Sequence, residues 1–168
     1  LTPGMKLEIR PGIIGKTGSG QMTCIPIKTT VLSIQSDKEN LESISPGGLM
    51  ALGTDIDPFY CKNDNLAGNY IGLIDEMPPV YKHIEMSYQL TNDFDGNWKP
   101  KINDITTLQI GTLSIDSKVK CIKKKKISFK LSRPACIDTD YLILISIKIN
   151  KSIKIVGYGN LIGGEILI

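Results

Sequence analysis

Aromatic residues, histidine and paired cysteines are scarce in this sequence of 168 residues. Aromatic side chains make up 6% of the chain and are scattered, so no platform for stacking nucleic-acid bases is visible. The four cysteines, Cys24, Cys61, Cys121 and Cys136, are far apart, and only His83 could join them as a ligand. Because zinc sites use ligands in close pairs, we expect no metal site and interpret these residues as reduced thiols of an intracellular protein.

A long hydrophobic run is also missing. The longest nearly apolar stretch, residues 141–145, is far too short to cross a bilayer, and no signal-peptide pattern follows Leu1. We therefore expect a cytoplasmic protein with no membrane partner. Because the sequence does not begin with Met, we also expect it to be a piece of a longer chain.

Positive charge is present but mild. The formal net charge is +3, with 18 Lys and two Arg. This permits contact with nucleic acid without demanding it, since a dedicated binder carries a denser basic stripe. The lysines at 123–126 are interpreted first as a solvated strand edge and second as a phosphate contact.

Alternation of apolar and polar residues is the strongest pattern in the chain. It runs through five short stretches, separated by turn signals, namely residues 107–115, 118–122, 127–131, 143–149 and 153–156. In the first of these it places Leu108 and Ile110 inward, with Leu113 or Ile115 following a glycine irregularity. No long window carries the apolar stripe of a helix. The sequence therefore predicts an all-β chain, a sandwich or a barrel, with a domain boundary at the two prolines of residues 75–79.

No motif for catalysis stands out. Residues 12–17 end in Gly-Lys-Thr, but a phosphate loop needs four residues between its glycines and a following helix, so a hairpin turn is expected. His83 lies in an alternating strand without an orienting partner nearby in sequence. Asp55 and Asp57 share one face, yet Asp57 precedes a proline and suits a turn. The residues alone favour a binding module over an enzyme.

Three longer stretches resemble one family in order and spacing. They are residues 7–13 (LEIRPGI), 45–58 (SPGGLMALGTDIDP) and 64–72 (DNLAGNYIG), supported near the end by 133–136 and 155–159. The family is the gamma subunit of eukaryotic and archaeal translation initiation factor 2. The stretch 45–58 is the specific part of the resemblance.

The resemblance implies two β-barrels of the type that follow the GTPase domain in elongation factor Tu. Residues 1–77 are then domain II, without its N-terminal strands, and residues 78–168 are domain III. The sequence contains no phosphate loop and no NKxD motif. The chain itself is therefore not expected to be an enzyme, and GTP and Mg²⁺ are expected in an N-terminal domain of the parent GTPase.

The family binds methionyl initiator tRNA and delivers it to the small ribosomal subunit in a GTP-dependent ternary complex, together with alpha and beta subunits. By resemblance, domain II docks the alpha subunit and forms one wall of the pocket for the tRNA 3′ end. The matching loop holds Pro46, Gly47 and Gly48. Two glycines allow a backbone to approach a nucleotide closely, or they serve a tight turn. Lys62 and Asn65 are candidates for a phosphate or acceptor-strand contact.

Two other functions stay open. The parent could be another translational GTPase, such as a specialised elongation factor that delivers a different tRNA. Alternatively, the barrels could form a free-standing protein that binds partners without nucleotide. The tRNA that accompanies the native protein, and the native mass, distinguish these alternatives.

Overall fold

A computed structural model describes residues 1–37, 39–91, 98–150 and 152–168, which form strands and one short helix. The all-β prediction is confirmed. These residues divide into two compact units, Leu1–Ile13 with Ile25–Met77 and Ile14–Cys24 with Pro78–Ile168. Segment Ile14–Cys24 thus groups with the second unit, whereas the predicted domains assign it to the first. The turn expected at residues 92–96 lies outside the described residues.

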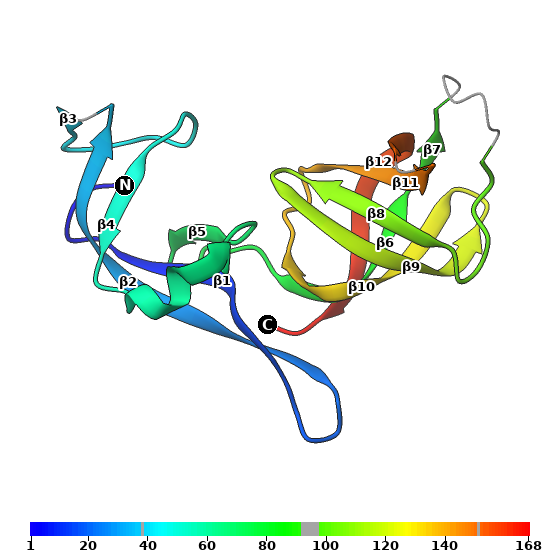
Figure 1. The fold of residues 1–168 in the computed structure, drawn as a ribbon, viewed down its shortest axis with the longest axis horizontal. Helices are drawn as coiled ribbons and strands as arrows, with labels where there is room; N and C mark the ends of the chain where they lie inside the picture. The colour runs from blue at the N-terminus through cyan, green and yellow to red at the C-terminus, as the bar shows by residue number, and fades with distance from the viewer. Residues whose placement is uncertain (38, 92–97, 151) are drawn as a thin grey trace. The chain divides into compact units, whose positions relative to one another are not determined.

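One antiparallel sheet has the strand order β3-β2-β1-β5, with β4 paired to β2 (Figure 1). Its strands are β1 (Lys6–Lys16), β2 (Met22–Ser36), β3 (Glu39–Asn40), β4 (Ala51–Thr54) and β5 (Tyr70–Leu73). The 3₁₀ helix η1 (Pro58–Asp64) connects β4 to β5. Within the described residues this sheet does not close on itself.

The core of the first unit is small. Leu7 of β1 and Val31 and Ile34 of β2 are fully buried, and five half-buried side chains pack around them: Leu1, Leu41, Ile44, Leu52 and Leu73. Beside this core, Glu8 is 4% exposed, and its carboxylate lies 2.5 Å from Nε of Arg10. A buried carboxylate needs such a partner, because desolvating an unpaired charge is costly.

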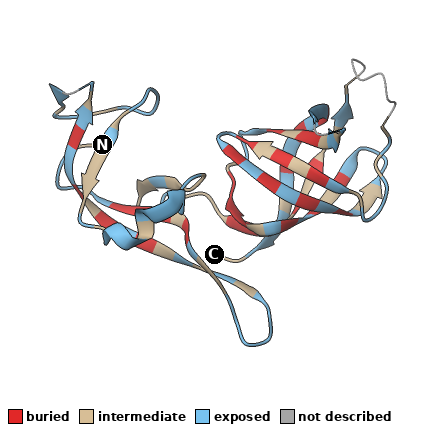
Figure 2. Ribbon diagram, in the orientation of Figure 1, coloured by how far each residue is buried: buried red, intermediate tan, exposed pale blue. Residues whose placement is uncertain are grey.

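The second sheet is a closed barrel. Its order is β11-β8-β9-β10-β6-β12, and pairing of β11 with β12 closes it, while β7 adds to β12. The strands are β6 (Val80–Ser87), β7 (Gln89–Leu90), β8 (Ile105–Ile110), β9 (Leu113–Lys123), β10 (Lys126–Cys136), β11 (Leu142–Ile149) and β12 (Ser152–Ile166). Buried residues alternate along them (Figure 2) and form one core around Phe129, which is fully buried.

The predicted single strand over residues 107–115 is wrong. The chain turns at Gly111 and Thr112, and Leu113 pairs with Ile110 across a hairpin. Gly111 has a φ of 56°, the left-handed conformation that tight hairpin turns require. The apolar alternation continues on both sides of the turn, which is why it reads as one strand. Leu108, Ile110, Leu113 and Ile115 are all buried, so the inward placement is confirmed.

The hairpin turn expected over residues 12–17 lies further along the chain, because residues 12–16 belong to β1 and the turn is at residues 18–19. β1 ends at Lys16 without a following helix, and the Thr17 N–H donates to the Gln21 carbonyl at 2.8 Å before β2 begins. The lysine run lies at the tip of the β9–β10 hairpin, where Lys123 pairs with Lys126.

Candidate functional site

The loop between β3 and β4 is anchored in the small core and exposed at its tip. Leu41 and Ile44 pack against the buried side chains, and the Leu41 N–H donates to the Ile34 carbonyl at 2.9 Å. The Ile44 N–H donates to the Leu1 carbonyl at 2.9 Å. The start of the loop is therefore held in place by packing and by these hydrogen bonds.

Pro46, Gly47 and Gly48 form the exposed tip of this loop. Gly47 has a φ of 114° and Gly48 a φ of 78°, conformations that L side chains rarely adopt. A Cβ built on Gly47 meets no atom within 4 Å, so open space surrounds it. Among the described residues, the N–H groups of Gly47 and Gly48 have no hydrogen-bond acceptor. The next residue, Leu49, is 93% exposed.

Lys62 lies at a kink within η1, where its ψ of 143° departs from the helical conformation. Asp57 caps the helix, since its Oδ1 accepts a hydrogen bond from the Phe59 N–H at 2.8 Å. The Lys62 ammonium lies 5.7 Å from the centroid of the Phe59 ring, within range of a cation–π contact. Phe59 is 64% exposed. Helix η1 therefore presents an aromatic ring and a positive charge together, a pairing that the sequence analysis did not single out.

Asn65 follows η1 with an exposed side chain, and its N–H donates to the Lys62 carbonyl at 3.2 Å. The segment behind it is held to β1 by Asn69. The Asn69 Oδ1 accepts from the Gly12 N–H at 2.9 Å, while its Nδ2 donates to the Leu66 carbonyl at 3.0 Å. The side chain of Asn69 thus links the segment after η1 to β1.

Strand β4 separates these two groups of candidate residues. The glycine loop precedes Ala51, and η1 follows Thr54 at the other end of the strand (Figure 1). Four strand residues span about 13 Å. The glycine loop and the Lys62–Asn65 segment are therefore two patches rather than one pocket.

The acidic residues considered in the sequence have structural partners. Asp55 accepts hydrogen bonds from the Thr29 hydroxyl at 2.6 Å and from the Thr30 N–H at 2.7 Å. These bonds to its charged form hold the pKa of Asp55 below its ordinary value of 3.8. Asp57 is a helix cap, as the turn interpretation predicted. No group of three or more His, Cys, Asp or Glu in the described part of the chain could hold a metal ion.

Comparison with known proteins gives the family. Residues 82–161 match the family described as "Initiation factor eIF2 gamma, C terminal". Subunit 3 of eukaryotic translation initiation factor 2 from Drosophila melanogaster is 30% identical over 98% of this chain and 37% of its own length. The gamma subunit from Encephalitozoon cuniculi is 32% identical over 98% of this chain and 38% of its own length. The chain thus matches the eIF2 gamma family over 98% of its length.

The chain spans a little over a third of the length of these relatives. A solved structure with a similar fold is elongation factor SelB from Methanococcus maripaludis in its apo form. Its TM-score is 0.69 at 16% identity, over 96% of this chain and 36% of SelB, so the likeness concerns the fold alone. Within the described residues, no helix is long and apolar enough to span a membrane.

Proposed function

We propose that residues 1–77 and 78–168 act as domains II and III of a gamma subunit that delivers methionyl initiator tRNA to the small ribosomal subunit. The parent protein works in the cytoplasm, binds GTP and Mg²⁺ in an N-terminal GTPase domain, and assembles with the alpha and beta subunits. The observation that carries this proposal is the match to eIF2 gamma relatives over 98% of the chain.

The glycine loop is the proposed contact for the tRNA 3′ end. Residues 1–77 carry six Lys and Arg against nine Asp and Glu, a formal net charge of −3. General attraction of phosphates to such a surface is weak, so contact has to come from close backbone approach. The open space at Gly47 and the N–H groups of Gly47 and Gly48, which lack acceptors in the described part of the chain, support this role.

Lys62 and Asn65 are the proposed second contact, to a phosphate or the acceptor strand. Lys62 supplies the charge and Asn65 an exposed amide. Because β4 separates this patch from the glycine loop, each patch meets a different part of the tRNA.

The test measures the affinity of the complete gamma subunit for methionyl initiator tRNA. Gly47→Trp should weaken binding about tenfold or more, roughly 1.4 kcal/mol, because a bulky side chain fills the space that the nucleotide would use. Gly4→Trp is the matched control: Gly4 has a φ of 90° and nothing within 4 Å of a built Cβ. It carries the same backbone strain outside the patch. Unchanged tRNA affinity of Gly47→Trp with an intact circular dichroism spectrum contradicts the loop's role.

The native protein, purified with its bound RNA and partners, also distinguishes the two alternative functions. A tRNA other than the initiator bound to the native protein identifies a specialised elongation factor. Binding of the alpha subunit by a native protein that has no GTPase domain identifies a free-standing partner-binding protein.

A further inference from the structure

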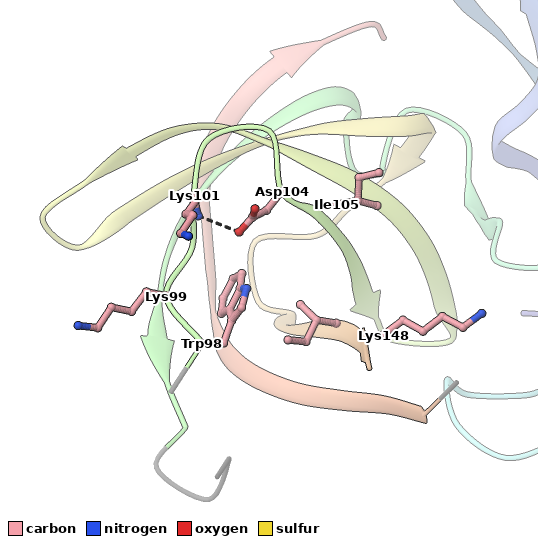
Figure 3. A pocket seen from close by; sticks show the side chains of 7 residues that line it. Trp98, Lys99, Lys101, Asp104, Ile105 and Lys148 are labelled. Carbon is pink, nitrogen blue, oxygen red and sulfur yellow. Dashed lines mark hydrogen bonds between the residues drawn. The ribbon is translucent and has the colours of Figure 1, made fainter. Parts of the chain in front are cut away.

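A hollow of about 690 Å³ opens on the surface of the second unit (Figure 3). It is unrelated to the glycine loop and to η1, which belong to the first unit. Its lining combines one aromatic ring, two isoleucines, three lysines and one aspartate: Trp98, Lys99, Lys101, Asp104, Ile105, Ile147 and Lys148.

Trp98 supplies a firm flat surface in this hollow. Its indole is half-buried and packs against the core of the barrel, as does Ile147. Ile105, at the start of β8, is 76% exposed and adds apolar surface to the hollow. Packing against a rigid core holds the ring in place, so little conformational entropy is lost when a second planar group stacks on it.

Lysines surround this ring. Lys99 and Lys148 extend from the hollow in opposite directions, with Trp98 between them (Figure 3). Both are exposed, as is Lys101. None of the three has an acidic partner within 4 Å among the described residues. Three positive charges around one hollow repel one another, and an anion placed there relieves that repulsion.

Strand register extends the basic surface on both sides. Ile105 pairs with Lys118 of β9, and Ile147 pairs with Lys154 of β12. Directly opposite residues of an antiparallel pair lie on the same face with Cβ atoms about 5 Å apart. Two more exposed lysines therefore adjoin the hollow.

The one acidic side chain among the described residues that line the hollow, Asp104, is hydrogen-bonded to the backbone. The Asp104 carboxylate accepts a hydrogen bond from the Lys101 N–H at 2.8 Å, and the Asp104 N–H donates to the Lys101 carbonyl at 3.1 Å. Asp104 thus closes the turn that leads into β8. The net charge of the lining stays positive, and residues 78–168 as a whole carry 14 Lys and Arg against eight Asp and Glu, a formal net charge of +6.

We propose that this hollow binds an unpaired nucleotide of an RNA strand, with the base stacked on Trp98 and the flanking phosphates at Lys99 and Lys148. Stacking uses the aromatic face of a base, and the lysines neutralise the backbone on each side of it. The choice of RNA over DNA rests on the proposed function. The stacking and phosphate contacts are argued from the hollow itself. The sequence predicted no stacking platform because Trp98 and Lys148 are 50 positions apart and meet only in the folded barrel.

Trp98 is the only tryptophan, so its fluorescence reports on this hollow alone. The 168-residue chain is titrated with a single-stranded 12-nucleotide oligoadenylate RNA at low salt. We expect saturable quenching of the tryptophan by the stacked adenine. Inorganic polyphosphate, which has charge but no base, should compete for the lysines without quenching. Quenching of equal depth by polyphosphate overturns the stacking.

Variants separate the contributions of ring and charge, with affinity measured by anisotropy of a labelled oligoadenylate. Trp98→Ala should weaken binding about tenfold, and Trp98→Phe should retain most of it. Lys148→Ala should lower the salt dependence of binding, by about 0.7 in the log–log slope for one phosphate contact. Lys124→Ala, at the exposed tip of the β9–β10 hairpin, is the matched control for charge and should change the affinity little.

Two further results overturn the proposal. One is the absence of quenching by oligoadenylate at 50 mM salt, with the barrel folded by circular dichroism. In that case the hollow faces a protein partner or no partner. The other is equal weakening by Lys124→Ala and Lys148→Ala, which means diffuse charge attraction. Neither result affects the glycine-loop proposal, because oligoadenylate is not aminoacylated and the loop lies in the other unit.

Discussion

His83 on β6 and Glu165 on β12 lie opposite each other in the barrel, with Nδ1 of His83 2.6 Å from Oε2 of Glu165. The ammonium of Lys82 lies 2.5 Å from the other carboxylate oxygen. Two hydrogen bonds hold the pKa of Glu165 below its ordinary value of 4.5. The bond from Lys82 has the larger effect, and the bond from His83 has the next largest. The only histidine therefore has a strand-joining role in this structure, consistent with its predicted place in a strand.

This relationship predicts a pH-dependent effect of Glu165→Gln. A carboxyl whose pKa is lower in the folded than in the unfolded chain stabilises the fold above about pH 4.5, and this contribution disappears as the pH falls through the folded-state pKa. We expect the variant to melt at a slightly lower temperature than the wild type at pH 7 and at the same temperature well below pH 4.5. The effect is small because the group is exposed.

Thermal unfolding followed from pH 3 to pH 7 checks this expectation. Glu42→Gln serves as control, because Glu42 is exposed and has no ion pair among the described residues. A melting-temperature difference for Glu165→Gln that is independent of pH is incompatible with the argument.

Two buried serines of the barrel are predicted to respond oppositely to removal of the hydroxyl. Ser146 is fully buried, and its Oγ has no hydrogen-bond partner among the described residues. Ser117 is also buried, and its Oγ lies 2.8 Å from the Thr106 hydroxyl. Ser146→Ala should be neutral or stabilise the fold by up to about 1 kcal/mol, while Ser117→Ala should destabilise it by about 1 kcal/mol.

The free energy of unfolding in urea measures both serine variants on the same scale. Equal destabilisation by the two substitutions would show that Ser146 has a partner in solution, against the structure.

Gly159 and Gly163 of β12 differ sharply in the space around them. A Cβ on Gly159 would lie 1.8 Å from the Ser87 carbonyl oxygen, whereas one on Gly163 meets nothing within 4 Å. Gly159→Ala should therefore destabilise the barrel by about 2–3 kcal/mol or more, because two strands must move apart. Gly163→Ala should stay within about 0.5 kcal/mol of the wild type. Denaturant midpoints measure both, and similar midpoints for the two variants would contradict the close packing of β12 against Ser87 of β6.

The two units should differ in independent stability. The barrel has a continuous core around Phe129 and no free sheet edge between β11 and β12, whereas the first unit buries only Leu7, Val31 and Ile34 in its central cluster. A fragment of residues 78–168 should unfold cooperatively, and a fragment of residues 1–77 should show a shallow transition. Circular dichroism melts of the two fragments test this, and a sharp transition for 1–77 alone would refute it.

Local signals in the sequence predicted much of this fold. Alternation placed Leu108 and Ile110 correctly in the barrel core, and the proline after Asp57 marked a turn that the structure resolves as a capped helix. Such features depend on residues a few positions apart, which is the range over which periodicity and capping act.

Long-range features were beyond the sequence. The hairpin at Gly111 was predicted to be one continuous strand because the alternation of apolar and polar residues continues through a tight turn. The bond from Gly12 to Asn69 and the approach of Trp98 to Lys148 depend on strand register and barrel closure, which no local pattern encodes. The glycine loop was found only through its family resemblance, since two glycines by themselves are equally compatible with a simple turn.

The intact mass of the native protein from its source, determined together with the RNA bound to it, tests the central claim most directly. The account predicts a mass far above the 18.4 kDa of this chain, with initiator tRNA as the bound RNA. A mass near 18.4 kDa, or a different tRNA, would contradict it.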